Sequence, residues 1–303
     1  MATTRKTLIQ WRDYLLLRLI FLLARPLSFR ALQRLGACLG RFCWHVFPFR
    51  RDVVLDNLTA SFGDELDPEQ IRRLARDFYI QLGTTLLEFC GYWRLRPDQL
   101  LDLVEVEGAE HIDALCGFDK GALVVSAHFG NWELIGAWSA AAGFEVSYLA
   151  KTQSNLRVDR LQNDLRNRAG VGVIRTGESL KPMIRVLRSG GFIGLLGDQD
   201  AGDGGLIMDF LGRPASVFRG TASLAWRLRV PMITAFVVRR PDGRHRLVMG
   251  EPVMPDPEWD EETAVRELTR IHTQRLEAII RKHPDHYFWV HRRWKHCSRK
   301  EEA

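Results

Sequence analysis

The sequence predicts an α/β fold in which a mostly parallel sheet is flanked by helices and preceded by an N-terminal helical, membrane-binding segment. From about residue 121 onward, short apolar runs alternate with stretches of helical periodicity, as in sheets whose two faces are covered by helices. The first 99 residues show helical patterns, and their beginning is both basic and apolar. We therefore expect a helical membrane-anchoring segment at 1–99, an α/β domain at 100–296 and a tail at 297–303.

The net charge of +6 is concentrated at the N-terminus. Residues 1–51 contain ten Lys and Arg residues and one Asp, a charge of +9, which leaves −3 for the rest of the chain. A nucleic-acid-binding protein usually spreads its positive charge over a reading surface, whereas here the charge coincides with apolar sequence. We expect this segment to meet an anionic membrane surface and expect no nucleic-acid partner.

Two apolar segments follow one another in this region. The first, Tyr14 to Ala24, is eleven residues long, which is shorter than the about 20 residues of a spanning helix. The second covers residues 27–49, and a helix over it brings three arginines within about 40° of one another. These are Arg30, Arg34 and Arg41. A basic stripe of this kind is typical of a helix that lies in the membrane interface.

Other interpretations of the two segments stay open. They can form one short membrane span, or two amphipathic helices that pack on the protein's own core. A cleaved signal peptide is not favoured, because no A-x-A site follows the apolar run. In an anchored protein, the basic flanks place the following domain on the cytoplasmic side.

Periodicity and helix-start signals define the remaining elements. Residues 69–93 carry apolar residues three and four apart after Asp67-Pro68, which predicts a helix. The expected strands are Ala122–Ser126, Val146–Ala150, Val171–Ile174, Phe192–Leu196 and Pro231–Val238. The expected helices are Trp132–Ala142, Arg157–Arg168, Leu180–Leu187, Phe218–Arg229 and Glu261–Arg281. In such sheets the functional groups lie beyond the carboxyl ends of the strands.

The first expected strand runs directly into a histidine, a glycine and the start of a helix. His128 and Glu133 are five residues apart, so a regular helix would separate them by about 140°. They can meet only if His128 lies in the turn and Glu133 in the first helical turn, which Gly130 permits. The carboxylate then accepts a hydrogen bond from one ring nitrogen, and the other nitrogen can take a proton from a hydroxyl. By itself, such a pair is more often structural than catalytic.

A second acidic motif, Asp198-Gln199-Asp200, follows the Phe192–Leu196 strand and also lies at a carboxyl edge. Two aspartates at this spacing can hold a divalent metal in a glycosyltransferase that uses a nucleotide diphosphate. Alternatively, they border a catalytic cleft and orient the histidine or the acceptor. The second interpretation is favoured because no nucleotide-binding glycine loop accompanies the pair.

The string from Gly121 to Glu133, GALVVSAHFGNWE, resembles the signature of the bacterial lipid A biosynthesis acyltransferases, the late lauroyl and myristoyl transferases. It is an H-x4-E variant of the H-x4-D motif of the wider glycerolipid acyltransferases. The resemblance covers nearly the whole chain, including the arginine-rich N-terminus. Further matches are Arg50-Arg51, Asn57-Leu58, Phe62-Gly63, Arg166-x-Arg168, Asp198-Gln199-Asp200, Phe210–Ala215 and, most distinctive, Tyr287–Lys295.

The resemblance implies transfer of a fatty acyl chain from an acyl-carrier-protein thioester to a hydroxyl of a lipid A precursor at the inner membrane. It implies His128 as general base and Glu133 as its orienting partner, with neither a cofactor nor a metal. The substrate-binding residues that it implies are Asn131, Arg166, Arg168, Asp198 and Asp200. The two arginines would hold an acidic headgroup or stabilise developing charge, although they can also belong to a solvated helix face.

Two absent motifs narrow the choice of reaction. No G-x-S-x-G elbow is found, which argues against a serine esterase, and no E-G-T-[RK]-S block is found, which argues against a simple lysophosphatidate acceptor. The alternatives are another membrane glycolipid or amino-acid lipid as acceptor, a metal-dependent glycosyltransferase, and a non-enzymatic membrane scaffold. The basic aromatic cluster at 291–295 can contact an acidic carrier protein, a lipid phosphate or only water.

Overall fold

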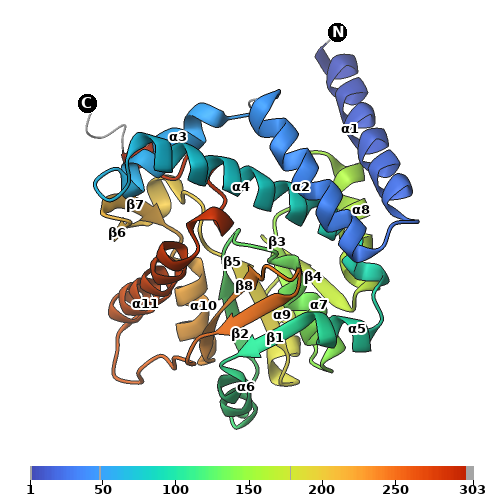
Figure 1. Cartoon of the computed structure of the whole chain (residues 1–303). Helices are drawn as coiled ribbons and strands as arrows, with labels where there is room; N and C mark the ends of the chain where they lie inside the picture. The colour runs from blue at the N-terminus through green and yellow to red at the C-terminus, as the bar shows by residue number, and fades with distance from the viewer. Residues whose placement is uncertain (1, 48, 178, 298–303) are drawn as a thin grey trace.

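The computed structural model describes residues 2–47, 49–177 and 179–297 as a group of N-terminal helices and an α/β domain (Figure 1). The first helices are α1 (Ala2–Ala24), α2 (Phe29–His45), α3 (Arg51–Phe62) and α4 (Pro68–Phe89), followed by the 3-10 turn η1 (Tyr92–Arg94). Asp67 forms a capping box with Gln70, and Pro68 lies in the first turn of α4. The predicted helix start is therefore confirmed.

Seven strands form the main sheet in the order β1-β9-β8-β2-β5-β3-β4. They are β1 (Val104–Glu107), β2 (Ala122–Ser126), β3 (Val146–Ala150), β4 (Val171–Arg175), β5 (Phe192–Leu196), β8 (Met232–Arg239) and β9 (His245–Met249). Neighbouring strands are parallel except β8 and β9, so the predicted mostly parallel sheet is confirmed. β6 (Leu206–Phe210) and β7 (Arg213–Val217) form a separate antiparallel pair after the 3-10 turn η2 (Gly202–Gly204).

Helices cover both faces of the sheet, and this explains why its central strands are apolar along their whole length. Ala122 and Val124 of β2 pack on one face, with α5 (Pro97–Leu103), α6 (Ala109–Cys116) and α7 (Glu133–Ala141). Leu123 and Val125 pack on the other face, with α9 (Lys181–Arg188), α10 (Gly220–Leu228) and α11 (Glu261–Lys282). α8 (Leu156–Arg168) connects β3 to β4, and the 3-10 turn η3 (Pro284–His286) leads into the C-terminal segment.

Two strands of the main sheet that the sequence did not predict, β1 and β9, lie outside its apolar centre. β1 has the alternating sequence Val-Glu-Val-Glu, and β9 alternates buried and partly exposed residues. Both are at one edge of the sheet, where only one face is fully covered. The predicted boundary at residue 99 falls within α5 and stays a prediction, and residues 298–303 of the predicted tail lie outside the described residues.

Three glycines allow α2 to lie directly against α4. A Cβ atom on Gly36 would come within 2.6 Å of the carbonyl oxygen of Gly83, and one on Gly40 would come within 2.6 Å of the Cα atom of Ile80. A Cβ on Gly83 would likewise lie 2.4 Å from the carbonyl oxygen of Gly36. The two backbones therefore pack at a distance that no larger side chain permits.

α1 and α2 also carry exposed apolar side chains. On α1 these are Leu15, Leu16, Leu19, Leu22 and Leu23, and on α2 they are Leu35, Leu39 and Phe42. The predicted stripe of Arg30, Arg34 and Arg41 is exposed beside them. One face of α2 therefore belongs to the protein core and another is apolar but uncovered. Within the described residues, no helix combines the length and the apolar character that crossing a membrane requires.

Candidate active site

A cavity of about 390 Å³ lies at the carboxyl ends of β2, β3 and β5, where the fold class places functional groups. One part of its wall is apolar and includes Val124, Ile135, Leu149, Leu195 and Leu196. The polar part includes Ser126, His128, Glu133, Lys151, Gln153, Asp159, Arg166 and Gln199. A volume of this size is typical of small-molecule sites, and the mixed wall suits a substrate with a polar and an apolar part.

His128 follows β2 and forms a hydrogen bond with Asp198, which follows β5. The distance between His128 Nδ1 and Asp198 Oδ1 is 2.9 Å. Because β2 and β5 are parallel neighbours, residues 70 positions apart in the sequence meet at one edge of the sheet. The Asp198 side chain is only 3% exposed. The pair has the geometry of a histidine base with an orienting carboxylate, which leaves Nε2 for a substrate.

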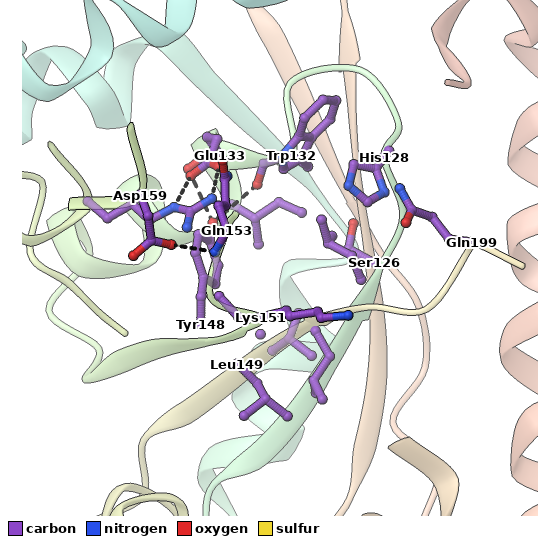
Figure 2. A pocket seen from close by; sticks show the side chains of 17 residues that line it. Ser126, His128, Trp132, Glu133, Tyr148, Leu149, Lys151, Gln153, Asp159 and Gln199 are labelled. Atoms are coloured by element: carbon purple, nitrogen blue, oxygen red, sulfur yellow. Dashed lines mark hydrogen bonds and ion pairs between the residues drawn. The ribbon is translucent and has the colours of Figure 1, made fainter. Parts of the chain in front are cut away.

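The structure corrects the expected partner of His128. Glu133 lies in the first turn of α7 as predicted, but its carboxylate forms two hydrogen bonds with the guanidinium of Arg166 (Figure 2). The distances are 3.0 Å from Nε and 2.5 Å from Nη2. Such paired contacts fix both groups, and they direct the Glu133 carboxylate to Arg166 and not to His128. The carboxylate that is hydrogen-bonded to His128 is that of Asp198. The expectation that the acidic motif after β5 orients the histidine agrees with this geometry.

The two carboxylates set the protonation of His128. Burial by itself disfavours the imidazolium ion, but the charge and hydrogen bond of Asp198 and the more distant charge of Glu133 outweigh it. The pKa of His128 is therefore raised above its ordinary value. Burial would also raise the pKa of Asp198, but His128 lowers it below the ordinary value, so Asp198 is a carboxylate at neutral pH.

Gly130 gives the loop after His128 its shape. Its φ angle is +55°, and a Cβ atom there would lie 1.8 Å from the carbonyl oxygen of Val237. Its N–H donates to the carbonyl oxygen of His286 at 2.8 Å, and its own carbonyl accepts from the hydroxyl of Thr85 at 3.2 Å. The loop is thus fixed by η3 on one side and by α4 on the other.

The C-terminal motif Tyr287–Lys295 forms part of the site. Phe288 lies beside the imidazole of His128, with ring centroids 5.5 Å apart, and Trp132 contacts it at 5.1 Å. Tyr287 donates from its hydroxyl to the backbone carbonyl of Asp198 at 3.2 Å. This motif therefore encloses the histidine and supports the loop that carries its partner, although almost 160 residues separate it from His128.

Asn131 lies beneath the cavity and is not among the residues that line it. Its side chain is fully buried and donates to Glu88 of α4 at 2.8 Å. Glu88 also accepts from Arg239 of β8 at 2.6 Å and from Gln33 of α2 at 2.7 Å. Asn131 was expected to bind substrate, but in the structure its amide joins the catalytic loop to a buried ionic cluster.

Arg168 and Asp200 also lie away from the cavity wall. Arg168 is two residues beyond Arg166 on α8, a rotation of about 200°, and its guanidinium stacks on the ring of Trp93 at 5.3 Å. Asp200 forms a hydrogen bond with His296, and its backbone N–H donates to Nε2 of His291 at 3.0 Å. Of the seven predicted site residues, only His128, Glu133 and Arg166 line the cavity, and Asp198 lies behind His128.

The structure adds three polar residues that the sequence did not single out as site residues: Ser126, Lys151 and Gln199. Ser126 is 6% exposed, and its hydroxyl has no hydrogen-bond partner among the described residues. Figure 2 shows Ser126 and Gln199 near the imidazole of His128, and Lys151 lines the same cavity. Ser126 ends β2, Lys151 directly follows β3 and Gln199 lies three residues after β5. Their positions at the carboxyl ends of parallel strands are the signal by which they could have been found.

Two further expectations concern groups outside the cavity. Within the cluster at 291–295, Arg293 and Trp294 are buried, and Arg293 donates to the carbonyl oxygen of Ser216 at 2.7 Å, so only Arg292 and Lys295 are exposed. The described residues contain no group of three or more His, Cys, Asp or Glu side chains arranged to hold a metal. The carboxylates of Asp198 and Asp200 instead face histidines.

Comparison with known proteins identifies the family. The model of the bacterial lipid A biosynthesis acyltransferases matches residues 1–296. The chain is 28% identical over 289 residues to the lipid A biosynthesis lauroyltransferase of Escherichia coli, covering 94% of this chain and 92% of that protein. It is 24% identical over 272 residues to the palmitoleoyltransferase of the same organism, covering 89% and 86%.

A relative with a different acceptor in its name also matches. The phosphatidylinositol mannoside acyltransferase of Mycobacterium tuberculosis is 26% identical over 193 residues, which cover 56% of this chain and 61% of that protein. Among solved structures, the 1-acyl-sn-glycerophosphate acyltransferase of Thermotoga maritima aligns over 83% of this chain and 98% of its own, with 19% identity and a TM-score of 0.36. The match of the family model to nearly the whole chain decides the assignment: the protein is an O-acyltransferase that belongs to the bacterial lipid A biosynthesis acyltransferase family.

Proposed function

We propose that this enzyme moves a fatty acyl chain from an acyl-carrier-protein thioester to a hydroxyl of a lipid A precursor on the cytoplasmic face of the inner membrane. The observation that carries the proposal is the His128–Asp198 pair at the polar end of a cavity with apolar walls. The names of the lauroyl and palmitoleoyl relatives support the acceptor. No cofactor is required, because a thioester is already an activated acyl donor.

In this mechanism His128 is the general base. Nδ1–H donates a hydrogen bond to the Asp198 carboxylate, so Nε2 has a free lone pair for the acceptor hydroxyl. The hydroxyl oxygen attacks the thioester carbonyl carbon, and its proton passes to Nε2. The carbon–sulfur bond then breaks, the ester is complete, and the proton moves from His128 to the departing thiolate. No acyl-enzyme is formed.

Other cavity residues supply binding and charge. The guanidinium of Arg166 lines the cavity, with Nε and Nη2 bonded to Glu133 and Nη1 bonded to Asn163 at 3.3 Å. The second N–H of each terminal nitrogen is left for a phosphate or a developing oxyanion. The unpartnered hydroxyl of Ser126 is a donor for the carbonyl oxygen of the thioester. Phe210 and Leu211 are buried in the core and do not line the cavity. We assign the acyl chain instead to the wall formed by Leu149, Leu195 and Leu196.

The N-terminal helices bring the cavity to the membrane. Exposed leucines on α1 and α2 lie beside exposed arginines, and this combination favours a surface with apolar chains and anionic headgroups. An anchored position lets the enzyme meet a lipid acceptor and a water-borne carrier protein at the same boundary. The exposed Arg292 and Lys295 add positive charge suited to an acidic carrier.

A second candidate acceptor is another membrane glycolipid, and the match to a phosphatidylinositol mannoside acyltransferase supports this alternative. The chemistry at His128 would be the same, because only the part of the acceptor that carries the hydroxyl differs. The metal-dependent glycosyltransferase and the non-enzymatic scaffold have no support among these relatives.

Mass spectrometry of the lipid product tests the proposal. Wild-type protein, acyl-carrier-protein thioester and lipid A precursor should give a product heavier by one acyl chain. His128→Ala should lose the product by about 10²-fold or more, whereas His111→Ala, on α6, should retain it. Acylation of a different glycolipid in the same membranes would move the acceptor but keep the base. Full activity in His128→Ala would overturn the mechanism.

A further inference from the structure

A second hollow, which we call the α1–α8 groove, lies between α1 and α8 and has a volume of about 720 Å³. It shares no lining residue with the catalytic cavity. α8 lies between the two: Arg166 faces the cavity and Arg168 faces the groove. Whatever occupies the groove is therefore separated by a helix from the reacting atoms.

Three arginines, Arg18, Arg25 and Arg168, line the groove together with a single acidic residue, Asp164. Their combined charge is +2 at neutral pH. Across the described residues, no carboxylate lies within the 4.0 Å ion-pair distance of any of these three exposed arginines. In contrast, Arg166, Arg175 and Arg239 are each paired with a carboxylate. Cations that converge without a counter-ion repel one another, and a bound anion relieves that repulsion.

Aromatic rings hold two of these guanidiniums in place. Arg168 lies 5.3 Å from the ring centroid of Trp93, and Arg18 lies 5.8 Å from that of Tyr14, whose hydroxyl it contacts at 3.3 Å. Stacking occupies the face of a guanidinium and leaves its N–H edges for an oxyanion. The groove is thus partly organised for an anion with several acceptor oxygens.

The rest of the groove is apolar and opens to the outside. Leu15, Leu19 and Leu22 of α1 line it and are 56%, 49% and 63% exposed. Their exposure is unfavourable in water and favourable beside a hydrocarbon chain. A ligand that satisfies both parts of the groove carries an anionic headgroup and an acyl chain.

Three contacts join the middle of α1 to the start of α8, before Leu15, the first groove residue. Gln10 donates to the carbonyl oxygen of Ser154 at 3.0 Å and accepts from the side chain of Asn155 at 2.9 Å. Arg157 lies 4.1 Å from the ring of Trp11. Beyond these contacts the two helices enclose the groove, so a ligand there would complete the attachment of α1 to the domain.

We infer that the α1–α8 groove binds one anionic membrane phospholipid, with its phosphate at Arg18, Arg25 and Arg168 and an acyl chain along the leucines of α1. This goes beyond a general attraction of the N-terminus to membranes, because it assigns a saturable site with one headgroup. The site is independent of the catalytic cavity, so its ligand is a stabilising lipid and not the acyl acceptor.

Thermal unfolding of the full chain in a nonionic detergent tests the inference, with dioctanoyl phosphatidylglycerol as the probe. A ligand that binds only the folded state raises the Tm, and above its Kd the rise grows with the logarithm of the ligand concentration. Wild-type protein should show this rise with phosphatidylglycerol and a much smaller one with dioctanoyl phosphatidylcholine, whose headgroup has no net charge. Arg168→Gln should raise the Kd fitted to this rise about tenfold, as expected for one charge-assisted contact.

Arg160→Gln is the matched control, because Arg160 is an exposed arginine on the same helix outside the groove. Equal effects of Arg160→Gln and Arg168→Gln would show diffuse attraction and overturn the site. His128→Ala should keep the wild-type response. Loss of the response in His128→Ala would place the probe in the catalytic cavity and also overturn the inference, while leaving the proposed reaction untouched.

If Arg168→Gln lowers the Tm without lipid, a second variant keeps the test decisive. Arg18→Gln removes a different guanidinium, on α1, and should weaken the same response by a similar factor. A normal response in this variant would contradict a phosphate shared between the two helices.

Discussion

His128 is influenced by two carboxylates in different ways. Asp198 touches its ring and fixes which nitrogen carries the proton, whereas Glu133 acts through its charge and through Arg166. The direct partner determines orientation, and both partners raise the pKa of the imidazole. A substitution at Asp198 therefore changes both the orientation of the imidazole and its pKa.

The first prediction at this scale concerns pH. In the proposed mechanism the neutral imidazole is the base, so its raised pKa means that wild-type activity should be lost as pH falls through a value above the ordinary one, about 6.5. Asp198→Asn removes the main raising charge, so the acidic limb of kcat should move to lower pH. The maximal kcat should fall about 10²-fold or more because orientation is also lost. An unmoved acidic limb in the pH–rate profile would contradict the assignment.

The second prediction concerns Ser126. Because its hydroxyl has no partner in the described part of the chain, Ser126→Ala breaks no contact within the protein and should leave the free energy of unfolding nearly unchanged. If the hydroxyl contacts the reacting carbonyl, kcat should fall about tenfold, equivalent to about 1.4 kcal/mol. Ser139→Ala is the matched control, since the Ser139 hydroxyl donates to the carbonyl oxygen of Ile135 at 2.8 Å on α7. Unchanged kcat in Ser126→Ala would remove it from the mechanism.

At the scale of elements, α4 links the N-terminal helices to the catalytic loop. Its glycine admits α2, its Thr85 supports Gly130, and its Glu88 joins Asn131 to Arg239 and Gln33. Burial alone would raise the pKa of Glu88, yet Arg239 and His245 hold it well below the ordinary value, so the cluster is ionised. The position of the loop thus depends on the packing of α2 on α4.

The α2–α4 contact yields a prediction for Gly83. A Cβ in Gly83→Ala would meet the backbone of α2 at 2.4 Å, so the helices must separate, and overpacking of this kind costs about 1–3 kcal/mol of unfolding free energy. Gly204→Ala, where nothing lies within 4 Å, should change it by less than about 0.5 kcal/mol. Denaturant unfolding of both variants measures the difference. Equal stability of the two would show that the close helix contact does not exist in solution.

At the scale of the whole molecule, apolar side chains and basic charge share one region of the surface. The exposed apolar residues of α1 and α2 belong to the segment that carries +9, while the remainder of the chain carries −3. In the proposed attachment, this asymmetry would turn the N-terminal helices toward an anionic apolar boundary and the negatively charged remainder of the chain away from it.

Membrane flotation tests this arrangement. Phe42 of α2 is 54% exposed, and Phe42→Glu replaces an apolar contact with a charge of the wrong sign. Its partition onto vesicles of phosphatidylcholine and phosphatidylglycerol should fall about tenfold or more, from the lost burial of about 1.5–3 kcal/mol. Leu101→Glu, at an exposed leucine of α5, should partition as wild type does. Equal losses in both variants would assign membrane binding to some other surface.

The sequence alone determined the fold class, the central strands, the main helices and the place of His128 at a strand end. These follow from local periodicity and from the turn chemistry of residues within a few positions of one another. The tertiary structure decided which carboxylate contacts the imidazole. It also placed Arg166 in the catalytic cavity and Arg168 in the α1–α8 groove, and it buried Asn131. Those outcomes depend on strand order and helix packing, which bring Asp198 to His128 across 70 residues and Glu88 to Asn131 across 43. Contacts between distant residues leave no periodic trace in the sequence, so only the folded chain reveals them.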